Sequence, residues 1–289
     1  MSSVQCNRRV RAALLKVKSR WGDVAFNIDL LEQMAVELQG RSIDVLITPE
    51  CFLDGYMERD RGRCTPEGLR ACAVEGFQDP VMQRAARLAA RLESYLVVGA
   101  SELGADRRLR NAAYLIDRQG ELAGTYYKIQ TSLFYTPGNE LPVFQTDFGR
   151  AGIVICADRR WPENMRCLRL KGAEVILNPT WGDKSPFNTA LMRVRAYENG
   201  IPVCFAHPEQ SLICSEEGEV IALCEASEPD ILIHEFELKP VRQDPGIDGQ
   251  TDVSDMHPAD NRRPDLYGAI VARDLHKSPS FGPQSGGLT

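Results

Sequence analysis

Short apolar runs that alternate with amphipathic segments set the strongest limit on how this chain folds. The runs at 43–50 (IDVLITPE), 95–101 (YLVVGAS) and 173–180 (AEVILNPT) are apolar almost throughout, as in strands that are buried on both faces. Residues 24–40 and 79–94 lie between them and carry apolar side chains at helical spacing. The pattern predicts an α/β fold in which helices cover sheets.

The second half of the chain repeats the order of the first half. In the first half, strands are expected at 10–18, 43–50 and 95–101, helices at 24–40 (ending at Gly40) and 79–94, and a hairpin at 109–128. In the second half, strands are expected at 151–157, 173–180, 201–208, 211–223 and 230–238, and helices at 161–172 and 188–200. We therefore expect two successive β-α-β-α-β-β halves that form an internal pseudo-repeat.

The composition changes after about residue 240. The rest of the chain is rich in Pro, Gly, Asp and Ser, which disfavours a packed core. We expect one domain over 1–240 and an extended C-terminal arm over 241–289, with its last ten or so residues loosely ordered.

Charge and cysteine usage exclude several classes of protein. The net charge of −6 provides no basic stripe for nucleic acid and argues against an anionic membrane surface. The chain start does not resemble a signal peptide, and no apolar run is long enough to span a membrane, so a cytoplasmic location is expected. The nine cysteines include no CxxC pair and no Cys/His cluster, so neither a disulfide framework nor a metal site is expected.

Three apolar strands each lead to a reactive residue: Glu50, Lys128 and Cys156. Ligands of α/β folds gather at the carboxyl ends of strands, where side chains face a crevice. Glu50 can take the proton of the Cys156 thiol and later return it. Lys128 can stabilise the thiolate and a developing oxyanion, together with a backbone N–H after the nucleophile.

Each of these residues also has an ordinary structural explanation. A cysteine at a strand end is more often a packing residue than a nucleophile. A glutamate after proline or a lysine after two tyrosines is most often a solvated strand end. Spacing alone leaves both interpretations open.

The motifs around these residues resemble the nitrilase superfamily, also called the carbon–nitrogen hydrolases. The matching stretches are ITPECF (47–52), YYKIQ (126–130) and FGRAGIVICADRRWPENMRCLRLKGAEVILNPTWG (148–182). TPGNELPVFQTDFG (136–149), RVRAYENGIPV (193–203) and RRPDLY (262–267) support the match. The resemblance covers roughly residues 9–240.

This resemblance implies a four-layer αββα sandwich with a Glu-Lys-Cys triad at Glu50, Lys128 and Cys156. It implies a thioester intermediate that water hydrolyses, with no metal or organic cofactor. It further implies a homodimer or higher homo-oligomer built on helices near the nucleophile and near 189–200, with the arm reaching the partner subunit.

The stretch CADRRWPE is similar to the N-carbamoyl-D-amino acid amidohydrolases, in which arginines after the nucleophile hold the substrate carboxylate. Arg159 and Arg160 suit that role, because guanidinium pairs with carboxylate through two parallel hydrogen bonds. Alternatively, at least one of them forms a structural ion pair with Asp158, Glu163 or a partner subunit. Two further residues, Tyr56 and Trp181, are candidate pocket walls, although ordinary packing explains them equally well.

The sequence also departs from the family pattern. Many members carry a second glutamate after the lysine, but residues 129–136 contain no acid, and Glu140 lies on the far side of the TPG turn. A histidine that is frequent in the family is Gln130 here, and Trp181 stands near the place of an asparagine contact in carbamoylases.

The resulting hypothesis is a cysteine-dependent hydrolase of non-peptide C–N bonds that acts on an N-carbamoyl amino acid or a small carboxylated amide. The alternatives are a general aliphatic amidase or nitrilase, a catalytically weak binding protein, and a redox sensor that uses the thiol. The intact triad argues against the binding protein, and the lack of a nearby resolving cysteine argues against the sensor.

Overall fold

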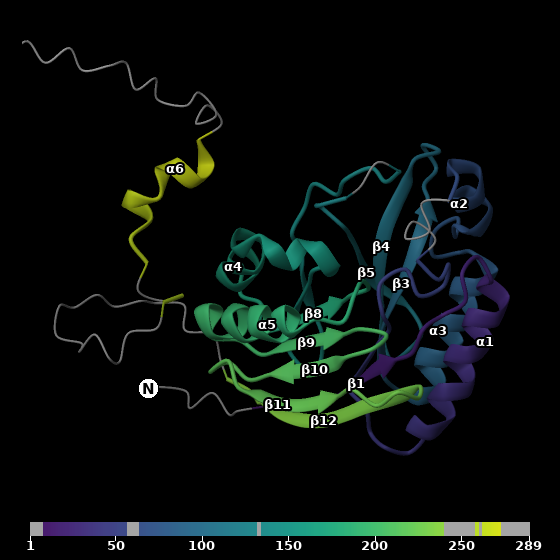
Figure 1. The fold of residues 1–289 in the computed structure, drawn as a ribbon. Coiled ribbons are helices and arrows are strands. Elements are labelled where there is room, and N and C mark those ends of the chain that lie inside the picture. The colour runs from purple at the N-terminus through teal and green to yellow at the C-terminus, as the bar shows by residue number, and fades with distance from the viewer. Residues whose placement is uncertain (1–7, 57–63, 132–133, 240–257, 260–261, 273–289) are drawn as a thin grey trace, which may run out of the picture.

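Two mixed β-sheets form the centre of the molecule (Figure 1). The computed structural model describes residues 8–56, 64–131, 134–239, 258–259 and 262–272. The first sheet has the order β12-β1-β2-β3-β4-β5, and the second has the order β11-β10-β9-β8-β7-β6. The strands of the first sheet are β1 (Arg8–Lys16), β2 (Val45–Ile47), β3 (Tyr95–Leu103), β4 (Leu109–Ile116), β5 (Leu122–Tyr127) and β12 (Asp230–Leu238). Those of the second are β6 (Val143–Gln145), β7 (Arg150–Ile153), β8 (Val175–Pro179), β9 (Val203–Ala206), β10 (Ser211–Cys214) and β11 (Val220–Cys224).

Helices cover the outer face of each sheet. The first sheet packs against α1 (Val24–Ala35) and α3 (Pro80–Leu92), and the second against α4 (Pro162–Leu170) and α5 (Pro186–Asn199). A separate apolar core fills the space between the two sheets. The layers are therefore helix, sheet, sheet and helix, which confirms the αββα sandwich. The shorter elements are α2 (Pro66–Cys72), α6 (Gly268–Val271) and the 3-10 turns at Val36–Leu38, Cys156–Arg160 and Pro264–Leu266.

The helix termini follow from local sequence signals. Asp79 caps α3 by accepting a hydrogen bond from the backbone of Val81, and Pro80 occupies the first turn. Ser185 caps α5 in the same way, and this helix ends at Gly200 with a φ of 60°. Pro162 opens α4 as expected from the WPEN signal.

The two halves of the chain are structural repeats. In each half the first strand runs parallel to the second, with Leu14 opposite Ile47 in one half and Ile153 opposite Leu177 in the other. Each half ends in an antiparallel meander, β3-β4-β5 or β9-β10-β11. The repeat was predicted; each half has the strand order of β-α-β-α-β-β-β, one strand more than the order β-α-β-α-β-β, although the strands expected individually in the first half already number five.

Several local predictions need correction. The helix expected over 24–40 ends at Ala35, and a 3-10 turn follows before Gly40. The strand expected over 211–223 is two strands, β10 and β11, joined by a turn at Gly218. The segment 230–238 crosses to the first sheet and pairs with β1. No local sequence pattern predicts this long-range pairing. Helix α2 and the three-residue strand β6 were not predicted.

The C-terminal arm is described only in part. Within it, the carbonyl of Pro258 accepts a hydrogen bond from Arg166 of α4 at 3.1 Å. The end of the arm, 273–289, lies outside the described residues, and the boundary at 240 stays a prediction.

No helix in the described part of the chain combines the length and apolar character needed to cross a membrane. The cytoplasmic location stays a prediction.

Candidate active site

The ends of β2, β5 and β7 bring Glu50, Lys128 and Cys156 into one region. Lys128 follows β5 directly, and its ammonium Nζ lies 2.5 Å from Oε1 of Glu50. Both side chains are buried, with 6% of Lys128 and none of Glu50 exposed. A buried ion pair of this kind is stable only when further hydrogen bonds complete it.

Three donors hold the carboxylate of Glu50. Oε1 accepts hydrogen bonds from Lys128 and from Nδ2 of Asn111 at 2.8 Å, and Oε2 accepts one from the backbone N–H of Trp181 at 3.2 Å. The backbone carbonyl of Asn111 also accepts from the backbone N–H of Lys128 at 2.9 Å. Asn111 therefore contacts both members of the ion pair.

The loop that carries Glu50 packs tightly on β3. A Cβ atom at Gly99 would lie 2.6 Å from the carbonyl oxygen of Pro49 and 2.7 Å from the backbone nitrogen of Cys51. These two backbone atoms flank Glu50, so this position requires glycine.

Cys156 begins a tight turn just beyond β7. Its φ of 44° lies in the left-handed region, which is uncommon for residues other than glycine and is frequent at functional sites. Its thiol donates to the backbone carbonyl of Trp181 at 3.4 Å. Because the N–H of Trp181 contacts Glu50, one residue links the carboxylate to the thiol.

The environment keeps the thiol and the ammonium protonated. Burial raises the pKa of Cys156 and the nearby Glu50 carboxylate raises it further, while Lys128 and Arg159 act in the opposite direction. Burial alone lowers the pKa of Lys128, but the charge of Glu50 and its hydrogen bond to the ammonium outweigh this effect, and the net direction is upward. A thiol of this kind needs a base before it can attack, and Glu50 is a carboxylate whose charge acts on this thiol; its role as the base stays a prediction.

Asp158 joins the segment of the lysine to the turn of the cysteine. Its carboxylate accepts from the hydroxyl of Tyr126 at 2.7 Å, from the backbone of Gln130 at 2.7 Å and from the backbone of Ile155 at 3.3 Å. Burial raises the pKa of Asp158. Within the described residues, no ion pair links Arg159 or Arg160 to Asp158 or Glu163, so that alternative explanation of the arginines is not supported inside one chain.

Of the two arginines, Arg159 alone lies beside the nucleophile. It is 5% exposed, and its Nη1 lies 3.4 Å from Sγ of Cys156 while its Nη2 donates to Asn188 at 2.8 Å. Its Nε is buried and has no partner among the described residues. The side chain of Arg160 is exposed, and its backbone carbonyl accepts from Arg195.

Comparison with known proteins identifies the family. The family model described as "Carbon-nitrogen hydrolase" matches residues 4–245. This chain belongs to the carbon–nitrogen hydrolases. It is an amidohydrolase by family, and the resemblance noted from its motifs is thereby confirmed.

Relatives of this hydrolase cover most of its length. A protein of Pseudomonas protegens named "Hydrolase in pqqF 5'region" is 31% identical and spans 94% of this chain and 95% of its own. The N-carbamoylputrescine amidase of Arabidopsis thaliana is 25% identical over 87% of this chain and 92% of its own. Among solved structures, an amidase from Nesterenkonia sp. has a TM-score of 0.72 at 22% identity and covers 93% of this chain and 99% of its own. That likeness supports the fold.

The two aromatic residues that were predicted as pocket walls lie together in this hydrolase. The rings of Tyr56 and Trp181 stack with their centroids 5.8 Å apart and an interplanar angle of 19°. Trp181 is buried, with 6% of its surface exposed, and Tyr56 is partly exposed. The stack stands beside the peptide that contacts Glu50 and Cys156, and its role as a substrate wall stays a prediction.

Two residues of the site were not predicted. Asn111 is a buried amide inside the apolar strand β4, and this interruption of an apolar run was the available signal. Asn188 lies in the first turn of α5, where the sequence gives no sign that it holds Arg159.

Glu140 is exposed, and in the described part of the chain Lys128 forms an ion pair with Glu50 alone. The same part contains no cluster of His, Cys, Asp and Glu that could hold a metal ion.

Proposed function

We propose that this hydrolase cleaves N-carbamoyl amino acids or similarly small amides that carry a carboxylate. In this proposal Cys156 is the nucleophile, Glu50 is the general base and Lys128 stabilises the transition state. The observation that carries the substrate class is the buried guanidinium of Arg159, 3.4 Å from the sulfur of Cys156.

In the first step Glu50 takes the proton of the thiol while Sγ attacks the carbonyl carbon of the substrate. The carbonyl oxygen becomes an oxyanion, which the ammonium of Lys128 and the backbone N–H of Ala157 stabilise. Glu50 then gives its proton to the departing nitrogen, the C–N bond breaks, and a thioester remains on Cys156.

In the second step Glu50 takes a proton from a water molecule, which attacks the thioester carbon. A second tetrahedral intermediate collapses, the C–S bond breaks, and Cys156 regains a proton. For an N-carbamoyl amino acid, the carbamic acid formed on the way breaks down, and the products are the amino acid, ammonia and carbon dioxide.

Arg159 favours a substrate with an anionic tail over one with a cationic tail. Asn188 and the face of Phe205 fix the guanidinium, whose central carbon lies 5.5 Å from the ring centroid. A positive charge beside the sulfur attracts a carboxylate and repels a protonated amine. This separates the proposal from the substrate in the name of the N-carbamoylputrescine amidases, which ends in an amine.

The alternative is a general aliphatic amidase or nitrilase that acts on neutral substrates. The exposed side chain of Arg160 favours it, since only one of the two arginines lies beside Cys156. In that case the guanidinium of Arg159 stabilises the thiolate of Cys156 and does not bind a substrate carboxylate.

Steady-state kinetics on paired substrates test the proposal. Ammonia release is measured with N-carbamoyl amino acids and with neutral amides of the same length, using the wild type and Arg159→Gln. The proposal expects KM to rise at least tenfold for the ureido acids and less than threefold for the neutral amides. Equal changes for both substrate types would favour the alternative.

We also propose that the chain forms a homodimer through the outer surfaces of α4 and α5. Large apolar side chains are exposed there: Trp161 (42%), Leu170 (49%), Phe187 (64%), Val194 (51%) and Tyr197 (55%). An exposed apolar surface of this kind is typical of protein–protein contacts. The partner subunit covers it in this proposal.

A further inference from the structure

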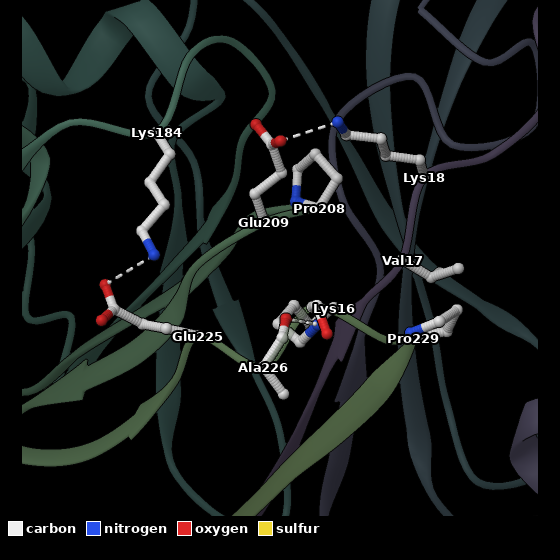
Figure 2. A pocket seen from close by; sticks show the side chains of 10 residues that line it. Lys16, Val17, Lys18, Lys184, Pro208, Glu209, Glu225, Ala226 and Pro229 are labelled. Atoms are coloured by element: carbon white, nitrogen blue, oxygen red, sulfur yellow. Dashed lines mark hydrogen bonds and ion pairs between the residues drawn. The ribbon is translucent and has the colours of Figure 1, made fainter.

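A hollow of about 400 Å³ opens beside Lys16, at the end of β1 (Figure 2). The segments that follow β1, β8, β9 and β11 form its walls. The residues that line it are Lys16, Val17, Lys18, Lys184, Pro208, Glu209, Glu225, Ala226, Ser227 and Pro229. It therefore lies at the carboxyl ends of parallel strands, where ligands of α/β folds gather.

The internal repeat relates this hollow to the active site. Leu14 of β1 and Ile153 of β7 occupy equivalent places, because each lies opposite the same position of its parallel neighbour, Ile47 or Leu177. Counting three residues onward from each gives Val17 in one half and Cys156 in the other. Val17 lines the hollow at the place that the nucleophile holds in the active site.

The meanders of the two halves lead to the same conclusion. Each has a β-bulge at an equivalent step, between Leu115 and Ile116 in one half and between Ile213 and Cys214 in the other. Counted from these bulges, Ala226 of the hollow corresponds to Lys128. The hollow thus occupies the place in the repeat that the active site occupies, with valine and alanine where the active site has its nucleophile and its lysine.

A buried cation distinguishes the hollow. Lys16 corresponds to Ile155, so the fold accepts an apolar side chain at this place and does not require a lysine. Lys16 is 2% exposed, and its ammonium donates to the backbone carbonyls of Ala226 (2.7 Å) and Glu228. An ammonium has three donors, and these two partners are neutral.

Among the residues that the structure describes, no carboxylate pairs with Lys16. In the described part of the chain, none lies within 4.0 Å of its ammonium. Asp230, its neighbour across the strands, is exposed and accepts a hydrogen bond from the thiol of Cys224 at 3.3 Å. A buried charge without a counter-charge is costly, and an anionic ligand would remove that cost.

The rim adds two further ammonium groups. Lys18 pairs with Glu209 at 2.7 Å, and Lys184 pairs with Glu225 at 3.4 Å, as the dashed lines in Figure 2 show. All four side chains are more than a third exposed, and such surface pairs contribute little stability, so a ligand can compete for the lysines. The three lysines and two glutamates leave the lining with one excess positive charge, in a chain whose net charge is −6.

We propose that this hollow binds a small molecule through a carboxylate or phosphate group, which lies beside the ammonium of Lys16 and is contacted by Lys18 and Lys184. The volume of the hollow is in the range of small-molecule sites, about 300–1,000 Å³. The wall at Lys184 belongs to the loop that starts at Trp181, whose backbone contacts Glu50 and Cys156. The site is distinct from the catalytic one but shares this loop with it.

Titration calorimetry with inorganic phosphate and, separately, with acetate tests the proposal on the whole chain. The wild type is expected to bind at least one of the two. Lys16→Met is expected to raise the Kd of that ligand at least tenfold. Ala226 is exposed, so Ala226→Phe fills the hollow and leaves Lys16 with its buried hydrogen bonds. This variant is expected to raise the Kd to the same extent. Binding of phosphate alone or acetate alone assigns the ligand to one class.

Lys171→Met is the matched control, because this exposed lysine also donates to a carbonyl, that of Leu141, outside the hollow. Its Kd is expected to stay within twofold of the wild type. An absence of binding by the wild type, an unchanged Kd in both Lys16→Met and Ala226→Phe, or a loss confined to Arg159→Gln would overturn the proposal. Binding is measured without turnover, so the result does not depend on the proposed function.

Discussion

The guanidinium of Arg159 lies 3.4 Å from the sulfur of Cys156. This cation and the ammonium of Lys128 oppose the effects of burial and of Glu50, which together raise the pKa of the thiol. The reactivity of Cys156 toward an alkylating reagent therefore reports on the charges around it.

Alkylation of Cys156 is expected to change in opposite directions when its neighbours are neutralised. Glu50→Gln removes a negative charge, lowers the pKa of the thiol and raises the thiolate fraction at pH 8. Lys128→Met removes a positive charge, raises that pKa and lowers the fraction. Below the pKa, the thiolate fraction changes by about tenfold for each pKa unit.

The measurement is the rate of iodoacetamide labelling at pH 8, followed at the peptide of Cys156 by mass spectrometry. Cys167, which is exposed on α4, is the internal control and should label at one rate in all variants. Slower labelling in Glu50→Gln than in the wild type would contradict the account. Glu50→Gln is expected to label faster than the wild type and yet to lose hydrolysis, and this combination makes the result distinctive.

Asn111 is expected to act as a positioning residue for Glu50. Asn111→Leu removes the hydrogen bond of 2.8 Å to Oε1 and leaves a side chain of similar size. A displaced base misaligns proton transfer, so kcat should fall by about tenfold to a hundredfold, while KM changes less than threefold. Kinetics at several pH values, together with the urea midpoint of unfolding, distinguish this effect from a loss of structure. A proportional loss of kcat and of folded protein would show that Asn111 is merely structural.

Gly99→Ala is expected to disturb both stability and activity. Its methyl group would meet the backbone on both sides of Glu50 at 2.6 and 2.7 Å. Overpacking of this kind typically costs about 1–3 kcal/mol, and the displaced loop carries the base. Gly268→Ala is the control, since a Cβ there meets nothing within 4 Å. Equal urea midpoints for the two variants would refute the packing argument.

The apolar surface of α4 and α5 is expected to hold a homodimer together. Phe187 and Tyr197 are 64% and 55% exposed, and Phe187→Glu with Tyr197→Glu would place two charges in the interface. Light scattering on a sizing column should give a dimeric mass for the wild type and a monomeric mass for the double variant. Val36→Glu, at the end of α1 on the other helical layer, changes an equally exposed apolar residue (56%) and serves as the control. A monomeric wild type would rule out the proposal.

Much of the architecture was predictable because it is encoded locally. The strands that lead to Glu50, Lys128 and Cys156 are apolar runs, and α3, α4 and α5 begin at proline, with a capping side chain before α3 and α5. Glu50 and Lys128 follow strands of the first sheet and Cys156 follows a strand of the second, so their meeting depends on how the two sheets stack. The family motifs supplied the sandwich itself.

The remaining features depend on contacts between distant segments. The pairing of β12 with β1 joins residues more than two hundred positions apart, and nothing in DILIHEFEL specifies the first sheet over the second. The same is true of Asn111 and Asn188, whose partners come from other elements. The two arginines are adjacent in sequence, yet the turn after Cys156 buries Arg159 and exposes Arg160, a difference that only the backbone path determines.

The most direct test of the central claim is ammonia release from an N-carbamoyl amino acid by the wild type and by Cys156→Ala, with the intact mass of each protein recorded during turnover. The account predicts release by the wild type, none above background by Cys156→Ala, and an acyl adduct on the wild type that maps to Cys156. Release that persists in Cys156→Ala would contradict it.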